Sequence, residues 1–129
     1  MGKGRGKFDL SGYDGEPTRS LSDNLSALLK QFPLSPSGYF GVKGASNPVR
    51  RIRSANPEQT AYHFFKLIAN GAGEKRDIPT GIVVTLKDGT RITYRVTSSS
   101  DGSPAVDIKI LVPVGIIKHK QKIHFEKEL

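Results

Sequence analysis

The fold is decided at residues 81–96, which read Gly81-Ile82-Val83-Val84-Thr85-Leu86-Lys87-Asp88-Gly89-Thr90-Arg91-Ile92-Thr93-Tyr94-Arg95-Val96. Apolar residues alternate with other residues on both sides of the Asp-Gly pair, which is typical of two antiparallel strands joined by a tight turn. A loop of residues 87–89 would pair Val84 with Ile92, so that apolar side chains share one face. A shorter turn would instead set Leu86 opposite Arg91. We therefore expect the longer loop, with its glycine at a positive φ.

The same alternation continues in residues 105–111 and 120–126, which we expect to form two more strands. Two helices are expected upstream. Residues 21–32 carry an apolar stripe behind a capping serine, and a second helix begins at Pro57 and stops before Gly71. The predicted fold class is α+β, with one or two N-terminal helices packed on one face of a four-stranded antiparallel β-meander.

The composition places limits on what the chain can be. It has 129 residues, 20 Lys and Arg against 12 Asp and Glu, a formal net charge of +8 and no cysteine. This basic balance favours a nucleic-acid partner, and the lack of cysteine excludes disulfides and thiolate metal sites. There is no apolar run of about 18 residues, so we expect no membrane-spanning segment. We expect no cofactor and no metal.

We expect one domain with a loosely attached N-terminal segment. Residues 1–45 would form that segment, a linker containing the short helix of residues 21–32. The stretch 1–19 in particular suggests a mobile arm, and residues 33–49 a connector. Residues 46–129 would carry the activity. The basic cluster Arg50-Arg51-Ile52-Arg53 would either contact phosphate without specificity or keep the linker soluble.

Chemically useful side chains alternate with the apolar residues of these strands. On the face away from the helices we expect Arg91, Thr93, Arg95, Asp107, Lys109, Lys122 and His124, with the loop of residues 97–103 at its edge. Cleavage of RNA without a metal needs a base for the 2′-hydroxyl, an acid for the leaving oxygen and cations for the charge on phosphorus. Histidine can fill either proton role, and Arg and Lys bind phosphate.

These residues define the candidate site. The catalytic candidates are His124, Arg95, Lys122, Ser98, Ser100 and Ser103, and the substrate-binding candidates are Arg91, Thr93, Thr97, Asp101, Lys109, His119 and Lys120. The second proton-transfer group stays open between His119, His63 and Lys122. The serine-rich run of residues 98–104 is also a good polar turn, and a solvated sheet face would carry arginines too.

Two other functions are consistent with the same residues. Glu58 on a helix, Asp88 in a hairpin and the triplet from Asp107 to Lys109 imitate the layout of metal-dependent DNases, in which carboxylates hold Mg²⁺. A non-catalytic RNA-binding module is the second alternative. It would bind RNA in a salt-dependent way without cleaving it.

Several stretches of this chain resemble the C-terminal toxin domains of bacterial polymorphic toxins, including those of contact-dependent growth inhibition proteins. The resemblance covers about residues 46–127 and is carried by Asn56-Pro57, Thr60-Ala61, Phe64-Phe65, Asp88-Gly89-Thr90, Tyr94-Arg95, Ser98-Ser99-Ser100-Asp101-Gly102-Ser103-Pro104-Ala105-Val106-Asp107-Ile108 and Gln121-Lys122-Ile123-His124-Phe125. A helix followed by a meander is similar to the barnase–EndoU–colicin–RelE group of ribonucleases.

The resemblance implies a function and a set of partners. It implies an antibacterial toxin domain at residues 46–129 that acts as a metal-independent endoribonuclease on tRNA or other RNA. Its active-site candidates would be Arg95, Ser98, Ser100, Asp101, Ser103, Lys122 and His124. The toxin would be delivered as part of a larger secreted or cell-surface effector, with residues 1–45 as a linker or an entry-related segment, and would act in the target-cell cytoplasm. A cognate immunity protein, acidic in character, would cover the basic cleft of an otherwise monomeric domain.

Overall fold

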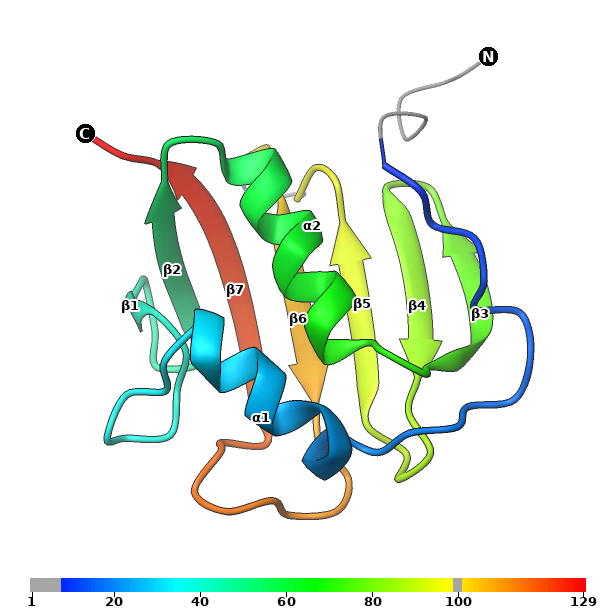
Figure 1. The fold of residues 1–129 in the computed structure, drawn as a ribbon. Helices are drawn as coiled ribbons and strands as arrows, with labels where there is room; N and C mark the ends of the chain where they lie inside the picture. Colours follow the sequence, from blue (N-terminus) through cyan, green and yellow to red (C-terminus); the bar gives the residue numbers. More distant parts are fainter. Residues whose placement is uncertain (1–7, 99–100) are drawn as a thin grey trace.

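The computed structural model describes residues 8–98 and 101–129, which form one sheet with two helices on one of its faces (Figure 1). The elements are α1 (Leu21–Gln31), β1 (Val42–Lys43), β2 (Val49–Ser54), α2 (Pro57–Ile68), β3 (Gly73–Ile78), β4 (Gly81–Thr85), β5 (Arg91–Arg95), β6 (Ala105–Lys109) and β7 (Lys120–Lys127). The seven strands lie in the order β1-β2-β7-β6-β5-β4-β3. The sheet is therefore continuous from one side of the molecule to the other.

The predicted fold class is wrong in the size and type of its sheet. Strands β4, β5, β6 and β7 are antiparallel neighbours in sequence order, as expected. The sheet, however, continues beyond β4 on one side and beyond β7 on the other. β3 pairs with β4 on one side, and β2 and β1 add to β7 on the other. β2 runs parallel to β7, so the sheet is mixed. The expected four-stranded meander is thus the central part of a seven-stranded mixed sheet.

The central hairpin has the register expected from its alternation. Val84 pairs with Ile92 and Ile82 with Tyr94. The backbone N–H of Leu86 donates to the carbonyl of Thr90 at 2.8 Å, which closes the loop of residues 87–89. Gly89 has a φ of +88°, a conformation that side chains with a Cβ rarely adopt. The prediction of this register is confirmed.

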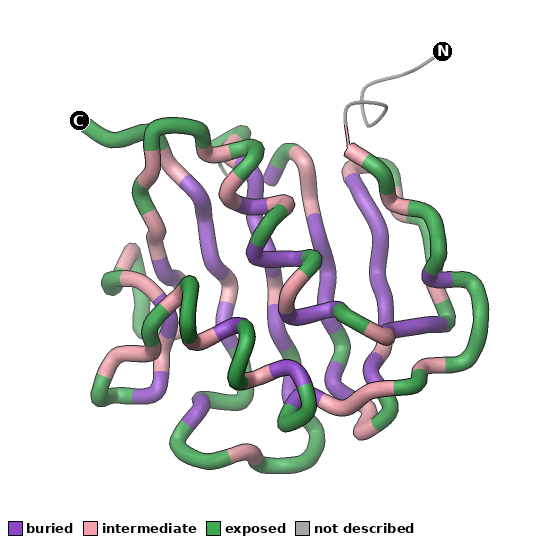
Figure 2. Tube along the Cα trace, viewed as in Figure 1, coloured by how far each residue is buried: buried purple, intermediate pink, exposed green. Residues whose placement is uncertain are grey.

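The core lies between the sheet and the helices, as Figure 2 shows by the buried stretches in the central strands and on the inner sides of α1 and α2. α2 begins as expected, with Pro57 in its first turn and the Asn56 side chain accepting from the Gln59 N–H at 3.2 Å. Its apolar stripe, which includes Phe64 and Phe65, is fully buried against the sheet. Burying large aromatic side chains is the main stabilising term in a domain of this size.

α1 packs on α2 rather than forming part of a separate segment. The buried Asn24 side chain donates to the carbonyls of Ile68 at 2.8 Å and Asn70 at 2.9 Å, at the end of α2. Leu21 and Leu28 are buried in the same core as the sheet residues. The β4–β5 hairpin contacts the same N-terminal end of α1, because the Asp88 carboxylate accepts from the Leu21 N–H at 3.1 Å. The segment that we expected to be a linker therefore contributes to the core.

Residues 8–19 pass beside β4 and β3 and then return below the sheet to α1 (Figure 1). Tyr13 is buried, and its carbonyl accepts from the Lys75 N–H at 2.9 Å. Phe8 stacks on Tyr62 of α2 with the ring centroids 4.6 Å apart. This stretch is thus ordered by contacts with α2 and β3 instead of forming the mobile arm that we expected. The prediction for residues 1–7 lies outside the described residues.

The basic cluster before α2 forms β2, and its three arginines do not share one role. Arg50 points to the core side, is buried, and donates to the carbonyls of Phe40 at 3.2 Å and Gly41 at 2.9 Å. Its guanidinium also lies over the Tyr39 ring, 4.5 Å from the centroid. Arg50 therefore holds the connector of residues 33–49 in place, and the expectation that it contacts phosphate or solubilises a linker is wrong.

No helix in the described part of the chain is long and apolar enough to span a membrane.

Candidate functional site

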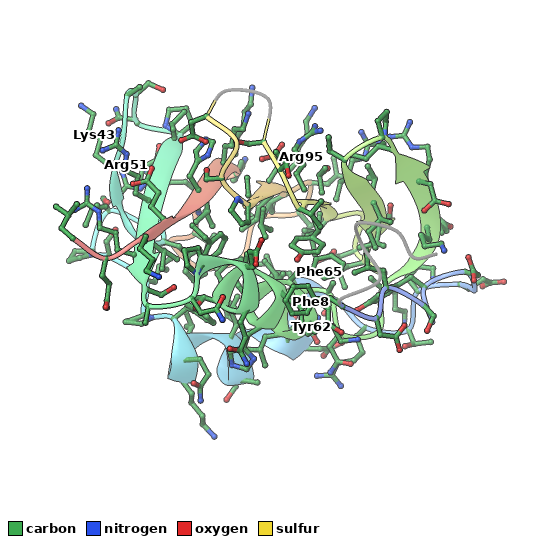
Figure 3. The ribbon with its side chains drawn as sticks, turned by 90° about the horizontal axis from the view of Figure 1, so that it is seen from above. Phe8, Lys43, Arg51, Tyr62, Phe65 and Arg95 are labelled. Atoms are coloured by element: carbon green, nitrogen blue, oxygen red, sulfur yellow. The ribbon has the colours of Figure 1, made fainter. Side chains whose placement is uncertain are left out.

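The face of the sheet away from the helices, called the open face below, collects most of the predicted site residues. Figure 3 shows Arg95 and Arg51 on this side, with Tyr62 and Phe65 of α2 on the other. Cross-strand pairing sets the residues in rows. One row contains Arg95, Ala105, His124 and Arg51, the next Thr93, Asp107, Lys122 and Val49, and the third Arg91, Lys109 and Lys120. The prediction that these side chains share one face is confirmed by this register.

His124 is held at one end of the open face by the loop between β5 and β6. We call His124, Ser98, Asp101 and Ser103 the loop cluster. The Ser103 hydroxyl lies 2.9 Å from His124 Nδ1 and 2.6 Å from Asp101 Oδ1. The Ser98 hydroxyl donates to the same Asp101 oxygen at 2.9 Å. The His124 side chain is only 6 % exposed, so it is covered to a degree that sequence alternation did not predict.

The hydrogen bonds of Ser103 determine which nitrogen of His124 carries a proton. Ser103 has one hydroxyl hydrogen, and the ionised Asp101 carboxylate can only accept, so the hydrogen points to Asp101. His124 Nδ1 must then donate to the Ser103 oxygen. In the neutral imidazole this leaves Nε2 with the lone pair, and no residue among 8–98 and 101–129 hydrogen-bonds that atom. Nε2 is therefore poised to accept a proton.

Asp101 stays ionised well below neutral pH. The hydrogen bond from the Ser103 hydroxyl is the largest cause, followed by the Ser103 backbone N–H, and together with Ser98 and the nearby His124 they lower the pKa of Asp101 to about 2. Hydrogen bonds to the charged form of a carboxylate favour that form. The carboxylate thereby ties Ser98 to Ser103 and orients His124 through Ser103.

A second group of predicted residues lines a cavity of about 350 Å³ at the other end of the open face. We call this cavity the basic pocket. Its polar and charged lining consists of Arg91, Thr93, Asp107, Lys109, Lys120, Gln121 and Lys122, and Pro48 and Val49 form an apolar rim. Four of these side chains are cations contributed by three neighbouring strands, β5, β6 and β7. Converging cations of this kind bind phosphate.

Arg95 lies in the same row as His124 but two strands away from it. Its Nε is 3.6 Å from Asp107 Oδ2, and its Nη1 donates to the Thr80 hydroxyl at 3.4 Å. The predicted site residues are therefore on one face but in two groups, and Arg95 contacts Asp107 of the basic pocket. We expected these side chains to converge on a single site, and the spacing between strands explains why they form two groups instead. His124 and Arg95 are separated by β6, so their backbones lie about two strand spacings of 4.7–4.9 Å apart.

The remaining predicted residues fall in different places. Ser100 lies outside the described residues. Thr97 is exposed in the loop after β5, and His119 is exposed just before β7, where neither lines the basic pocket. His63 is on α2 beside the Phe32 ring, with the centroids 5.8 Å apart. His63 therefore lies in the helix layer on the other side of the sheet and cannot share a reaction with His124.

Sequence alternation missed the contribution of β2 to the open face. Arg51 pairs in register with His124, and Arg51 and Arg53 lie 3.6 and 3.9 Å from Glu126 oxygens. Polar and apolar residues do alternate here, because the apolar Ile52 separates Arg51 from Arg53. The pattern is hard to recognise, since the buried Arg50 puts a charged residue on the core side, where an apolar residue is expected.

The layout expected for a metal-dependent DNase is not assembled. Asp88 hydrogen-bonds to the Leu21 and Thr90 backbone at the hairpin, and Asp107 is on the open face. Glu58 is in the first turn of α2, in the helix layer. Across residues 8–98 and 101–129, no three His, Cys, Asp or Glu side chains are grouped to hold a metal ion. The geometry does not favour this alternative.

Comparison with known proteins adds no independent guide to the function. No family model matches the chain, and neither the curated proteins nor the solved structures contain a match to it.

Proposed function

We propose that the chain is an endoribonuclease that cleaves RNA on the open face of its sheet without a metal. The observation that carries the proposal is the hydrogen-bonded chain from Asp101 through Ser103 to His124, on the same face of the sheet as Arg95 and the basic pocket. A carboxylate that orients an imidazole through a hydroxyl supplies a base of defined tautomer. Cations beside it attract and hold the phosphate backbone.

The reaction follows from the roles of these groups. His124 Nε2 removes the proton from a ribose 2′-hydroxyl, and the 2′-oxygen attacks the adjacent phosphorus. The bond from phosphorus to the 5′-oxygen breaks as that oxygen takes a proton from Lys122, which is on the same strand and face as His124. Arg95 and Lys122 stabilise the charge on phosphorus. The products are a 2′,3′-cyclic phosphate and a 5′-hydroxyl.

The biological setting is part of the proposal. The toxin resemblance and the net charge of +8 support tRNA or another RNA as substrate in the cytoplasm of a target bacterium. They also support an acidic immunity protein as the partner that covers the open face, and delivery as part of a larger effector.

The test is incubation of the purified chain with total RNA and with plasmid DNA, each with and without EDTA. We expect RNA cleavage in both RNA samples, with 2′,3′-cyclic phosphate ends, and intact plasmid. Because proton transfer typically contributes about 10²–10⁴-fold, we expect His124→Asn to lower the rate at least about 100-fold. The asparagine amide can still donate to Ser103, so the loop is kept. The matched control is His63→Asn, in the helix layer, which should cleave at the wild-type rate.

Two results would overturn the proposal. Plasmid nicking that EDTA abolishes would point to the metal-dependent alternative. Salt-sensitive RNA binding without cleavage would identify a non-catalytic RNA-binding module, the second candidate, which the 6 % exposure of the His124 side chain favours. Wild-type cleavage by His124→Asn would remove this residue from the mechanism.

A further inference from the structure

We propose that the basic pocket is a ribonucleotide subsite that binds a phosphate through its cations and a ribose 2′-hydroxyl through Asp107. The inference rests on the proposed function, since it assumes that the open face binds RNA. It adds a site at which the chain distinguishes ribose from deoxyribose. Two observations carry it, namely an uncompensated row of cations and a carboxylate oxygen that lacks a donor.

The cations repel one another across the strands. Arg91 pairs in register with Lys109, and Lys109 with Lys120, so three like charges stand side by side on neighbouring strands. Like charges directly opposite are destabilising. No carboxylate in the described part of the chain forms an ion pair with any of these three side chains or with Lys122. A bound anion would relieve this repulsion.

Asp107, by contrast, has an acceptor oxygen that needs a hydrogen-bond donor. Its Oδ2 lies 3.6 Å from Arg95, but its Oδ1 is buried and has no hydrogen-bond partner. A buried acceptor without a donor costs about 1–3 kcal/mol. The Asp107 side chain as a whole is 30 % exposed and lines the pocket, so a rotation of its carboxylate brings an oxygen to a ligand donor and removes this cost. The phosphodiester of an RNA chain has no hydrogen to donate at neutral pH, and a phosphate monoester is mostly a dianion. The ligand that satisfies the whole pocket therefore combines an anion with a hydroxyl or amine.

A ribonucleotide has that combination in the right arrangement. The 3′-phosphate and the 2′-hydroxyl are on adjacent carbons, and Asp107 is the direct cross-strand neighbour of Lys122. The row of Arg91, Lys109 and Lys120 is two residues further along, about 7 Å at 3.3–3.4 Å per residue. The cavity of about 350 Å³ suits one nucleotide rather than a duplex, and Pro48 and Val49 offer an apolar wall for the sugar or base. The 2′-hydroxyl is the group by which proteins recognise RNA.

The experiment measures binding of mononucleotides, which the proposed reaction cannot cleave. Uridine 3′-monophosphate and 2′-deoxyuridine 3′-monophosphate are each titrated into ¹⁵N-labelled protein, and affinities are read from amide shifts. We expect shifts at Thr93, Asp107 and Lys122, and at least about fivefold tighter binding of the ribonucleotide. Because the readout is binding, a failure of the cleavage assay does not affect it, and a failure here leaves the cleavage assay standing.

Three variants separate the two parts of the pocket. Asp107→Ala should weaken ribonucleotide binding and leave deoxyribonucleotide binding unchanged or tighter, because a negative charge is removed. Asp107→Asn keeps a neutral acceptor and should restore part of the preference for ribose. The double variant Lys109→Ala/Lys120→Ala should weaken both nucleotides about tenfold or more without changing their ratio.

The control double variant is Lys30→Ala/Lys87→Ala, which removes the same charge from exposed positions outside the pocket. It should bind both nucleotides as the wild type does. Equal affinities of the wild type for ribose and deoxyribose would overturn the role of Asp107. An equal loss of affinity in the two lysine double variants, or shifts confined to other parts of the chain, would overturn the pocket itself.

Discussion

At the scale of single residues, the role of each polar side chain on the open face follows from its hydrogen-bond partners more than from its residue type. Ser98 and Ser103 were expected to be catalytic, but both hydroxyls donate to Asp101. Asp101 in turn is the acceptor that these two serines share. His124 acquires a defined tautomer only because Ser103 has a single hydrogen to donate.

The link between Ser103 and Asp101 predicts a change in titration. In Ser103→Ala the largest hydrogen bond to the carboxylate is lost, so the pKa of Asp101 should rise from about 2 toward its ordinary value near 4. Carbon-13 NMR of the carboxyl group measures the midpoint. Asp9, whose pKa is lowered by its own bond to Ser11, is the internal control and should not change. A midpoint for Asp101 that stays near 2 would show that Ser103 does not hold it.

The sign of the pH effect follows from the direction of that shift. A carboxylate with a lowered folded-state pKa stabilises the fold at every pH above its unfolded value near 4. The stabilisation is lost as the pH falls through about 2. The Asp101 side chain is 48 % exposed, so solvent screens much of the effect. Acid should therefore loosen the loop cluster well below neutral pH.

At the scale of elements, β2 adds a further row of side chains to the open face beside β7. Its parallel pairing with β7 places Arg51 beside His124 and Val49 beside Lys122. This pairing depends on the connector of residues 33–49, which Arg50 and Gln121 hold through backbone carbonyls and one N–H. Two buried polar side chains thus position a strand whose own sequence is strongly basic.

Removing the Arg50 guanidinium should destabilise the protein. Arg50→Ala leaves the Phe40 and Gly41 carbonyls without their donor and opens space over Tyr39, so we expect a loss of about 2–3 kcal/mol. Urea unfolding followed by circular dichroism measures it. The matched control is Arg53→Ala in the same strand, whose side chain is 43 % exposed and which should change stability by less than about 0.5 kcal/mol. Equal midpoints for the two variants would contradict a structural role for Arg50.

At the scale of the whole molecule, the helices and the charges are on opposite faces of one sheet. The two helices and residues 8–19 cover one face and bury the aromatic core. The other face is left to cations from β2, β5, β6 and β7. A chain with a net charge of +8 and this separation should attract nucleic acid through the open face.

Salt dependence tests this separation. With His124→Asn, which should bind without cleaving, the affinity for a single-stranded RNA should fall with salt at a log–log slope of about −3, since four pocket cations each contribute about 0.7. Adding Lys109→Ala and Lys120→Ala should reduce the slope to about −1.5. Adding Lys30→Ala and Lys87→Ala instead should leave it unchanged. Fluorescence anisotropy at several salt concentrations provides the measurement, and equal slopes for both combinations would place the RNA elsewhere.

Much of the central sheet and both helices could be predicted because their signals are local. Gly89 and the alternation around it determine the register of β4 and β5, and Asn56 with Pro57 marks the start of α2. The sequences of strands β1 and β3 do not show the apolar alternation from which a strand is predicted. β1 has two residues, and β3 reads Gly-Glu-Lys-Arg-Asp-Ile, a polar edge strand without a continuous apolar face.

The sequence was enough to predict which residues share the open face, but not which of them are neighbours on that face. Alternation along each strand is enough to assign Arg91, Arg95 and Lys122 to the same side. Whether Arg95 meets His124 or Asp107 depends on strand order and on the spacing between strands, which no local pattern contains. The orphaned oxygen of Asp107 is likewise a property of its surroundings and could not be identified from the sequence.

The helices, the four central strands, the hairpin register and the basic character of one sheet face can be read from the amino-acid sequence alone. Each of these depends on residues within a few positions of one another, where backbone geometry relates sequence spacing directly to direction in space. The folded structure was needed to show that β2 joins β7 in parallel, that Arg50 is buried, and that His124 is covered by the loop carrying Asp101. Those outcomes depend on contacts between residues far apart in the chain, whose free energies are determined by packing and by the satisfaction of buried polar groups.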